Sequence, residues 1–404
     1  MHIIMELLET SINQLASKFW RCGWGGKAST TLMFVTGFVM STVLANEQTW
    51  TPLRVVAGHR IHMGTAVKYD MIVQNADYRA MVVREYDLVT PENALKWGAL
   101  RPDEKTFDFH QADAIVEFAR SNHIMVRGHN LCWNEYKHAP KWLLEGTYTP
   151  EQARELLKAH IQTVMAHYRG KVFCWDVVNE AVANNPKDAN TPLNDGFWLR
   201  HLGPEYVELA FRYAHESDPQ TELFYNDYDL SDPMGPKSDR IYQLVKNLKA
   251  KGVPIDGGVG LQAHYNLNRA PTTQASQADI QRYAALGLKI HLTELDVQLE
   301  GNPLPLATKL NLQAKIYAEA TRAALSTPAC EAIVTWGFSD RWGIEHFMHE
   351  AEQKGTEFPQ RLPFDRELKP KPAAFAMAAA LREANLSSHE STPKQAMRRE
   401  NGSN

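Results

Sequence analysis

The chain has 404 residues and a formal net charge of −4, with 44% hydrophobic and 22% charged residues. Its length fits one large (β/α) barrel or two medium domains, and its near-average composition excludes the disordered and fibrous classes. The mild acidity gives no global attraction to nucleic acid, which we do not expect as a partner, or to anionic membranes. The 10 tryptophans and 14 tyrosines are compatible with a large core and with a sugar-binding cleft.

Residues 1–45 are predicted to be a signal peptide. An apolar run of 13 residues, 32–44, follows Arg21 and Lys27 and is too short to span a bilayer comfortably. Val43-Leu44-Ala45 matches the small-x-Ala pattern of a cleavage site. We therefore expect an exported protein, secreted or periplasmic, with no stable membrane association after cleavage. An uncleaved anchor or a misassigned start is the alternative.

Residues 46–386 alternate strand-like and helix-like patterns, which predicts one catalytic domain. Because parallel strands need helical crossovers, this alternation predicts an α/β fold, a single (β/α)8 TIM barrel. The alternative is a doubly wound open sheet, which usually carries a glycine-rich phosphate loop after its first strand; here that segment, GTAVKYD, has one glycine. Residues 387–404 are predicted to be a flexible polar tail. The predicted strands are 60–66, 87–90, 125–129, 173–179, 223–226, 258–264, 289–294 and 333–336, and the predicted helices are 111–121, 151–168, 205–217, 237–251, 274–287 and 307–325.

Cys132, Cys174 and Cys330 are the cysteines that would remain after export, and each lies in an apolar strand-like run. We expect buried free thiols, with a Cys132–Cys174 disulfide as the alternative. His346 and His349 have a spacing that a metal site could use, but no third ligand is evident. No metal and no organic cofactor is therefore predicted.

Polar or aromatic side chains follow seven of the eight predicted strands. Because barrel enzymes carry their chemistry at the carboxyl ends of the strands, these residues are expected to converge on one site. Packing alone does not require such a pattern. In chain order they are Glu92, Asn93 and Lys96; His129 and Trp133; Asn179 and Glu180; Asn226 and Tyr228; Gln262 and His264; Glu294 and Asp296; and Trp336.

Two of these residues, Glu180 and Glu294, are carboxylic acids at the ends of strands that should be buried. Burial raises the pKa of Glu180, as a general acid requires, and hydrogen-bond donors lower the pKa of Glu294. We expect Gln262 and His264 to share a face and to donate to Glu294, with Asp296 behind His264. Two carboxyls with diverging pKa values are typical of glycoside hydrolysis. The alternatives are a salt-bridged wall residue at 180, a wall histidine at 264 and a helix cap at 296.

At these residues the chain resembles glycoside hydrolase family 10, mainly endo-1,4-β-xylanases with a (β/α)8 barrel. The resemblance covers residues 55–380 and rests on the motifs VTPENALKW, RGHNLCW, WDVVNEA, YNDY, GVGLQAH, HLTELD and TWGFSD. It implies endo-acting hydrolysis of internal β-1,4-xylosidic bonds in xylan with retention, by double displacement, with the polysaccharide as the partner. Apart from the resemblance, we expect a monomer. The alternatives are another β-1,4-glycan as substrate, transglycosylation, or a non-catalytic glycan-binding protein.

The resemblance also implies a role for each site residue. Glu180 would be the acid/base and Glu294 the nucleophile, and Asn179 would bond the 2-hydroxyl of the reacting sugar. Gln262 and His264 would position Glu294, with Asp296 behind His264. Glu92, Asn93 and Lys96 would bind the next sugar on the non-reducing side, and His129, Trp133 and Trp336 would enclose the reacting sugar. Asn226 and Tyr228 would lie near the leaving-group side.

The sequence departs from the family pattern in two places. After Trp133 the family usually has His-Ser-Gln, but this chain has Asn134-Glu135-Tyr136. A second tryptophan usually follows eight positions after Trp336, where this chain has Ile344, and the nearest indole is Trp342. We expect both changes to alter sugar binding and to leave the catalytic pair intact.

Overall fold

The computed structural model describes residues 50–134, 138–186, 192–228, 235–343, 348, 352–353 and 358–390. The predicted signal peptide and residues 391–404 lie outside these ranges. The barrel belongs to a compact unit that begins at Pro52. None of the described helices is both long enough and apolar enough to cross a membrane.

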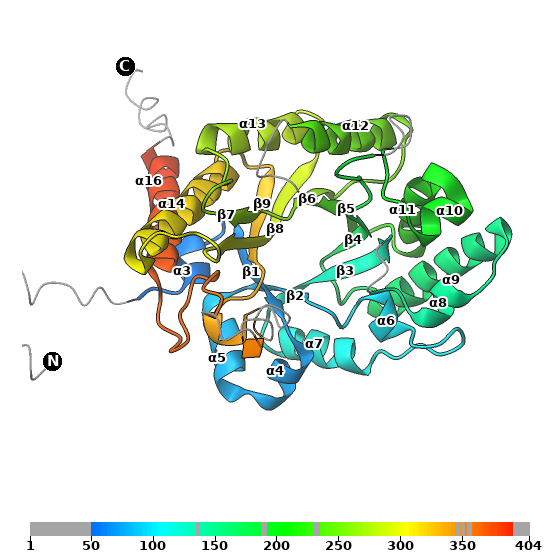
Figure 1. The fold of residues 1–404 in the computed structure, drawn as a ribbon, viewed down its shortest axis with the longest axis horizontal. Helices are drawn as coiled ribbons and strands as arrows, with labels where there is room; N and C mark the ends of the chain where they lie inside the picture. Colours follow the sequence, from blue (N-terminus) through cyan, green and yellow to red (C-terminus); the bar gives the residue numbers. More distant parts are fainter. Residues whose placement is uncertain are drawn as a thin grey trace, which may run out of the picture. The chain divides into compact units, whose positions relative to one another are not determined.

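Eight parallel strands form a closed ring (Figure 1). Consecutive strands pair from β1 to β6, β6 pairs with β8, β8 with β9, and β9 with β1. This closed order confirms the predicted barrel and excludes the open sheet. The strands are β1 (His62–Val67), β2 (Leu88–Pro91), β3 (Met125–Trp133), β4 (Cys174–Asn179), β5 (Glu222–Asp227), β6 (Gly258–Leu261), β8 (Lys289–Gln298) and β9 (Cys330–Thr335).

Helices surround the ring, and all six predicted helices are present. The sequence dictates some of their ends: α9 begins with a capping box between Thr149 and Gln152 and has Pro150 in its first turn. The long helices are α7 (His110–Ser121), α9 (Pro150–Tyr168), α11 (Tyr206–Ser217), α12 (Pro236–Ala250), α13 (Thr273–Ala284), α14 (Leu306–Leu325) and α16 (Pro372–Glu390). Shorter ones are α3 (Leu53–Ala57), α4 (Tyr69–Gln74), α5 (Ala76–Glu85), α6 (Trp97–Leu100), α8 (Lys141–Glu145), α10 (Phe197–Leu202), η2 (Gly203–Glu205) and η3 (Asp340–Trp342).

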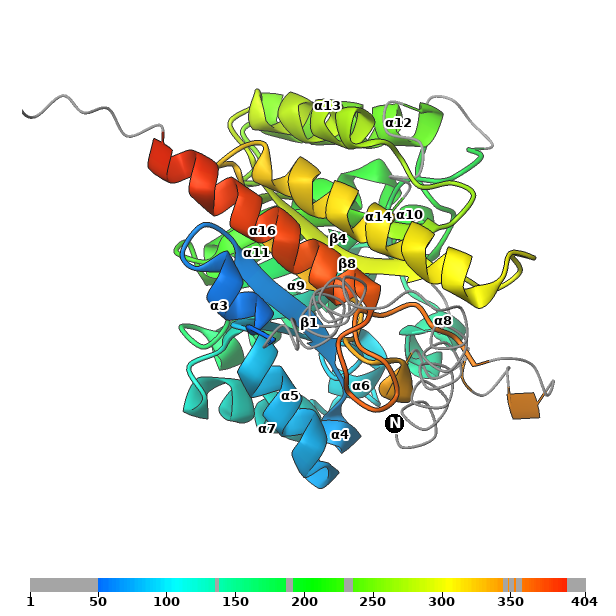
Figure 2. The same cartoon turned by 90° about the vertical axis from the view of Figure 1, so that its left-hand side faces the viewer.

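Helix α16 was not predicted as an element. It lies alongside α14, where it covers one side of the barrel (Figure 2). It continues to Glu390, so the predicted boundary between domain and tail at residue 386 falls inside a helix. The alanine-rich first half of α16 has six residues that are at most 1% exposed, which shows that the helix belongs to the core.

The predicted sixth strand, 258–264, is divided in the structure. It consists of β6 and a short β7 (His264–Asn266), and Ala263 between them has a left-handed φ of 61°. β6 pairs with the first half of β8, whereas β7 pairs with its second half and sets His264 opposite Asp296. Gln262 and His264 therefore do not share the face of one regular strand, and that prediction was wrong.

The barrel wall is buried at almost every strand position, as expected for parallel strands covered by helices. Cys132, Cys174 and Cys330 are buried free thiols, as predicted, and the alternative disulfide is not formed. Burial raises the pKa of Cys174 and Cys330 to about 12, which keeps both thiols protonated and unreactive at neutral pH.

Candidate active site

Glu294 lies in β8 with its side chain 6% exposed. Asn226 donates a hydrogen bond from Nδ2 to Glu294 Oε1 at 2.8 Å, and His264 Nε2 lies 3.1 Å from Oε2. Burial by itself would raise the pKa of Glu294, but the hydrogen bond from His264 and the charges of His129 and His264 hold it below its usual range. Glu294 is therefore poised as an anion.

His264 links Glu294 to Asp296. Its Nδ1 lies 2.9 Å from Asp296 Oδ1, on the opposite edge of the ring from Glu294. Burial would lower the pKa of His264, but the charge of Asp296 and the bonds to both carboxylates raise it to about 10. A protonated His264 donates a hydrogen bond from each ring nitrogen. His264 is therefore not an isolated histidine of the barrel wall, and Asp296 serves as its partner and not as a helix cap.

Glu180 follows β4 directly and accepts two hydrogen bonds. Gln262 Nε2 donates to Oε1 at 2.8 Å, and Trp133 Nε1 donates to Oε2 at 3.1 Å. Burial and the charge of Glu294 raise the pKa of Glu180, and Asp227 adds to the effect, although the bond from Gln262 opposes it. The two glutamates are therefore driven apart in pKa, in the directions that an acid and a nucleophile need.

Asn179 joins the surroundings of the two glutamates. Its Oδ1 accepts from Asn226 Nδ2 at 2.9 Å and from Gln262 Nε2 at 3.5 Å. Asn226 and Gln262 are the same amides that donate to Glu294 and Glu180. With Asn179 they form a chain of side-chain amides, which fixes both carboxyl groups relative to one framework.

The backbone of Glu180 adopts a left-handed φ of 53°. Its N–H donates to Asn226 O at 2.8 Å, and its carbonyl accepts from Asn194 Nδ2 at 2.7 Å. Left-handed backbone is unfavourable for a non-glycine residue, so these bonds are needed to hold the turn. The turn carries the chain from the barrel wall into the site, which is how Glu180 reaches it.

A second set of bonds holds the two residues after Glu180. Ala181 N–H donates to Tyr225 Oη at 3.1 Å, and Val182 N–H donates to Asp227 Oδ2 at 3.3 Å. The Tyr225 hydroxyl itself donates to Asp227 Oδ2 at 2.5 Å. Asp227 Oδ1 lies 3.0 Å from the Lys237 ammonium, and both side chains are at most 2% exposed.

Sequence reasoning did not identify Asn194, Tyr225, Asp227 and Lys237 as residues of the site. The sequence does indicate Asp227, because it lies in the YNDY motif between the predicted site residues Asn226 and Tyr228. A buried aspartate in an apolar strand needs a cation, and a search for that cation would have led to Lys237, near the start of α12.

Two predicted placements need correction. Gln262 donates to Glu180 and not to Glu294, because the break at Ala263 turns it to the other carboxyl. Asn226 was expected on the leaving-group side, but it is completely buried and donates to Glu294. Asn226 therefore holds the Glu294 carboxylate from within the barrel wall and is not available to contact a sugar.

The other predicted residues surround this centre. Lys96 Nζ donates to Asn93 Oδ1 at 2.9 Å and lies 5.1 Å from the centre of the Trp133 ring, and Glu92 precedes Asn93 at the end of β2. This arrangement brings a cation, an amide and an indole face together beside Glu180, a combination that suits a hydroxyl-rich ligand.

His129, Trp336 and Tyr228 occupy the remaining positions. His129 Nδ1 lies 3.0 Å from Asp176 Oδ2, and its ring meets Trp336 edge to face with the centroids 5.4 Å apart. The Tyr228 ring lies beneath the Lys237 ammonium, 3.0 Å from its centre. Trp133 bonds Glu180, and Trp336 also meets the ring of His264 edge to face with the centroids 6.3 Å apart, so an indole lies beside Glu180 and another beside the histidine that contacts Glu294.

Asn134, the first departure from the family pattern, is buried and uses both ends of its amide. Its Oδ1 accepts from Trp198 N–H at 3.0 Å, and its Nδ2 donates to Asn194 O at 2.6 Å. Because Asn194 holds the carbonyl of Glu180, Asn134 anchors the segment that supports this glutamate. Glu135, Tyr136 and Ile344 lie outside the described residues, as do His346 and His349 of the conceivable metal site.

Comparison with known proteins gives consistent matches over the barrel. A family model described as Glycosyl hydrolase family 10 matches residues 53–380. The chain is 36% identical over 338 residues to "Endo-1,4-beta-xylanase B" of Thermotoga neapolitana, and this match covers 82% of this chain and 92% of the relative. The structure of native xylanase 10B from Thermotoga maritima superposes with a TM-score of 0.75 at 34% identity, covering 83% of this chain and 99% of that one.

A further solved structure, xylanase 10B from Thermotoga petrophila RKU-1, is described as a complex with xylobiose. It is 33% identical, with a TM-score of 0.75, and the match covers 84% of this chain and 99% of that chain. The match to the family model extends from α3, before β1, into α16, so it includes every element that carries a site residue.

Proposed function

The chain belongs to glycosyl hydrolase family 10, and from this membership and the geometry of the site we propose that it is an endo-1,4-β-xylanase. It hydrolyses internal β-1,4-xylosidic bonds of xylan. The observation that carries the proposal is the pair of buried glutamates, Glu180 and Glu294, whose surroundings move their pKa values in opposite directions. The names of the relatives and the xylobiose complex support xylan as the substrate.

In the first step Glu294 acts as the nucleophile and Glu180 as the acid. The Glu294 carboxylate attacks the anomeric carbon, while Glu180 transfers its proton to the departing glycosidic oxygen. The bond from the anomeric carbon to that oxygen breaks, and an ester bond to Glu294 forms. Asn226 and His264 hold the carboxylate oxygens of Glu294 in place, which limits the reorganisation needed for attack.

In the second step Glu180 acts as the base. Formation of the ester removes the negative charge of Glu294, which is one of the causes of the raised pKa of Glu180. The pKa of Glu180 therefore falls after the first step, so that Glu180 can accept a proton from water. Water attacks the anomeric carbon, Glu294 leaves, and the configuration is retained. Both steps use only these two carboxyls and water.

The surrounding residues bind the sugars. Asn179 Oδ1 is occupied by Asn226 and Gln262, which leaves its Nδ2 as the donor for the 2-hydroxyl of the reacting sugar. The next sugar on the non-reducing side is bound by Glu92, Asn93 and Lys96, which follow β2. The reacting sugar is enclosed by His129, Trp133 and Trp336. Tyr228 contacts the leaving-group side.

Product analysis tests the proposal directly. The purified protein is incubated with polymeric xylan, with a linear β-1,4-glucan and with an aryl β-xylobioside. We expect a rapid fall of xylan viscosity before much reducing sugar is released, and NMR should show the β-anomer as the first product. Preferential cleavage of glucan, release of monomers from chain ends, or the α-anomer as first product would each contradict the proposal.

We also propose that the protein is exported, with cleavage of its signal peptide after Ala45, and that it acts as a monomer. The support for export is the apolar run and small-residue motif before residue 46. Amino-terminal sequencing of protein recovered outside the cytoplasm tests the first point, and sedimentation equilibrium tests the second. Recovery of an intact amino terminus in membranes, or of a dimer at micromolar concentration, would contradict them.

A further inference from the structure

Thr293, the residue before the proposed nucleophile, lies inside the barrel wall. Its hydroxyl donates to Asn226 Oδ1 at 2.7 Å, and both side chains are at most 1% exposed. Asn226 Nδ2 donates in turn to Glu294 Oε1 at 2.8 Å. Two consecutive residues of β8 therefore contact opposite ends of one amide: Thr293 supplies a donor for its oxygen, and Glu294 accepts from its nitrogen.

The strand is irregular at this point. Adjacent side chains of a regular strand point to opposite faces, yet those of Thr293 and Glu294 both reach Asn226. The pairing of β8 with β9 changes register between Leu292 and Leu295, and an irregularity of this kind re-aims the side chains next to it. The irregularity thus brings the hydroxyl and the carboxylate to the same amide.

The orientation of this amide matters because its two ends are chemically different. Asn226 Nδ2 uses its two hydrogens on Glu294 and on Asn179 Oδ1, which lies at 2.9 Å. If the amide turned over, its oxygen would face these two acceptors. Among the described residues no donor other than Thr293 reaches Asn226 Oδ1, and a buried acceptor without a partner is unfavourable. The Thr293 hydroxyl therefore stabilises the orientation in which Asn226 can donate to Glu294.

Gly260 leaves the space that this hydrogen bond needs. Strand β6 pairs with both β5 and β8, and Gly260 lies opposite Asn226 in the register. A Cβ atom added at Gly260 would lie 2.3 Å from Asn226 Oδ1 and 2.9 Å from Thr293 Cγ2. A larger residue would therefore displace both partners, so glycine permits their close approach. The contact between Thr293 and Asn226 is built into three neighbouring strands.

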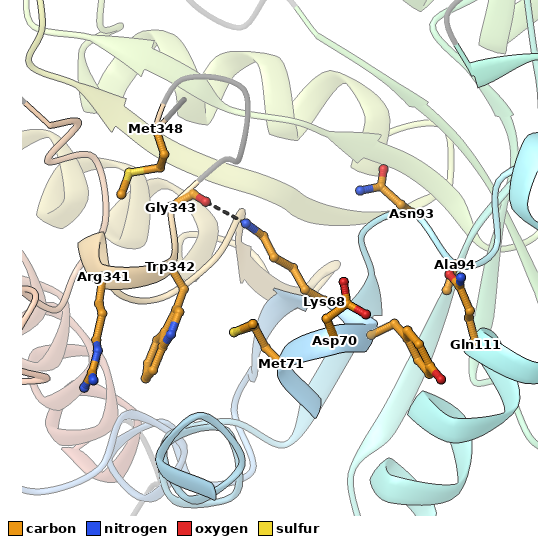
Figure 3. A pocket seen from close by; sticks show the side chains of 11 residues that line it. Lys68, Asp70, Met71, Asn93, Ala94, Gln111, Arg341, Trp342, Gly343 and Met348 are labelled. Atoms are coloured by element: carbon orange, nitrogen blue, oxygen red, sulfur yellow. Dashed lines mark hydrogen bonds between the residues drawn. The ribbon is translucent and has the colours of Figure 1, made fainter. Parts of the chain in front are cut away.

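The same contact lies apart from the open part of the cleft. A pocket of about 360 Å³ beside the proposed sugar-binding residues has Lys68, Asn93 and Trp342 in its wall (Figure 3). Neither Thr293 nor Asn226 lines it, and both are buried. We therefore expect a change at Thr293 to act on the carboxylate of the nucleophile and not on sugar binding, whatever the length of the substrate.

We propose that Thr293 is a positioning residue for the proposed nucleophile: its hydroxyl fixes the amide of Asn226, and Asn226 holds the Glu294 carboxylate for attack on the anomeric carbon. The proposal rests on the proposed xylanase function. The side chain of Thr293 touches neither the sugar nor the reacting atoms, so its effect on the reaction passes through Asn226. A general loss of stability would not show this dependence on a second residue.

The test compares Thr293→Val, which keeps the shape of the side chain and removes its hydroxyl, with Thr293→Ser, which keeps the hydroxyl. In Thr293→Val, kcat/KM should fall about tenfold on an aryl β-xylobioside and on linear xylohexaose alike, the factor that corresponds to one buried hydrogen bond. In Thr293→Ser it should stay within about threefold of the wild type. If Thr293→Val does not fold, Thr293→Ser and Thr293→Ala, which also differ by the hydroxyl alone, give the same comparison.

Thr321→Val is the matched control. The Thr321 hydroxyl is buried and donates to Tyr317 O at 2.8 Å within α14, away from both glutamates. This variant also loses a buried hydroxyl with its hydrogen bond, and it should leave kcat/KM within about twofold of the wild type. A tenfold loss in Thr321→Val would show that any such deletion lowers activity, and it would overturn the specific role of Thr293.

A double-mutant cycle tests whether Thr293 acts through Asn226. In the Asn226→Ala background there is no amide to orient, so Thr293→Val should change kcat/KM there by less than about twofold. A dinitrophenyl β-xylobioside, which has a good leaving group, keeps weak variants measurable. A loss in this background as large as the loss in the wild type would overturn the proposal.

The pH profile gives a further readout. The hydrogen bond from Asn226 is one of the causes that hold the pKa of Glu294 low, so the acid limb of kcat/KM should move to higher pH in Thr293→Val and not in Thr293→Ser. The charged and titratable side chains around this carboxylate are unchanged in both variants; they are Arg127, His129, Glu180 and His264. A profile that falls at every pH without movement of the acid limb would indicate a purely structural role and would overturn the proposal.

Wild-type activity separates the two ways of failing. Equal activity of Thr293→Val and Thr293→Ser, with an active wild type, would overturn the role of Thr293 and leave the proposed function intact. A wild type that cleaves neither substrate would overturn the proposed function, and the role of Thr293 with it.

Discussion

Asp227 accepts a hydrogen bond from the backbone N–H of Val182, two residues beyond Glu180, at 3.3 Å. The same carboxylate faces the Lys237 ammonium, which is buried with it. Its charge also contributes to the raised pKa of Glu180. One buried carboxylate therefore both holds the turn after the proposed acid and favours the protonated form of that acid.

Replacement of Asp227 by asparagine should change the pH profile of the enzyme. Removal of the negative charge lowers the pKa of Glu180, so the proton needed for the first step is lost at a lower pH. We expect the alkaline limb of kcat/KM against pH to move toward lower pH. Asp279→Asn, which alters another buried, ion-paired aspartate on α13, should leave this limb in place. An unmoved limb in Asp227→Asn would contradict the assigned role.

The buried ion pair between Asp227 and Lys237 should also contribute to the free energy of unfolding. Asp227→Asn leaves the Lys237 ammonium buried without its partner, and breaking a buried pair in this way costs about 3–5 kcal/mol of unfolding free energy. The double variant Asp227→Asn, Lys237→Met removes both charges and should recover most of that loss. Urea unfolding of the two single variants and the double variant measures the coupling, and simple additivity would refute it.

His264 should control the acid side of the profile. His264→Gln removes the positive charge that lowers the pKa of Glu294, so the nucleophile is protonated at a higher pH and activity is lost earlier on acidification. The acid limb of kcat/KM should move to higher pH. Asp296→Asn is the contrasting variant: an ordinary histidine has a pKa of about 6.5, so His264 still carries its charge at the pH of the acid limb. An upward shift in Asp296→Asn as large as in His264→Gln would argue against this explanation.

The two glutamates should differ in their dependence on the leaving group. Glu180→Gln should lower kcat/KM on xylan by about 10²–10⁴-fold, the usual contribution of a general acid. With an aryl xylobioside the loss in the first step should be smaller, because a good leaving group needs little protonation. Glu294→Gln should abolish activity on both substrates. Glu155→Gln, at an exposed position of α9, is the control, and circular dichroism verifies that each variant is folded.

The barrel was predictable because its strands and helices carry strong periodic patterns. Each predicted strand overlaps an observed one, and the helices begin and end within a few residues of the expected positions. The polar residues at the strand ends could likewise be selected, because parallel strands bring their carboxyl ends to one face. These features depend on local sequence and on one topological rule.

The hydrogen-bond partners were less predictable, because they depend on backbone geometry that spacing does not reveal. A single left-handed residue, Ala263, redirects Gln262 from one glutamate to the other. Asn226 and Tyr228 are two residues apart in one motif, yet Asn226 is buried beneath Glu294, whereas Tyr228 lies partly exposed beneath Lys237. Alternation along a strand identifies a shared face but not the depth of each side chain.

Asn134 should not tolerate the histidine that the family usually has at this position. A Cβ atom added at Gly196 would lie 2.3 Å from Asn134 Oδ1, which shows how closely the backbone packs against the amide. Asn134→His would therefore be overpacked and would lose two hydrogen bonds, with an expected cost of about 1–3 kcal/mol. Asn134→Asp keeps the acceptor for Trp198 and should cost less. Thermal unfolding of both variants decides the point, and a stabilised Asn134→His would contradict it.

The left-handed turn at Glu180 has a consequence for attempts to make this protein more heat-resistant. A residue with a Cβ in this conformation costs about 1–2 kcal/mol relative to glycine, and asparagine is also better suited to it. Glutamate is therefore not the most stable choice at position 180. A screen that scores only survival of the fold on heating will favour Glu180→Gly or Glu180→Asn, and it will return robust barrels that no longer cleave their substrate.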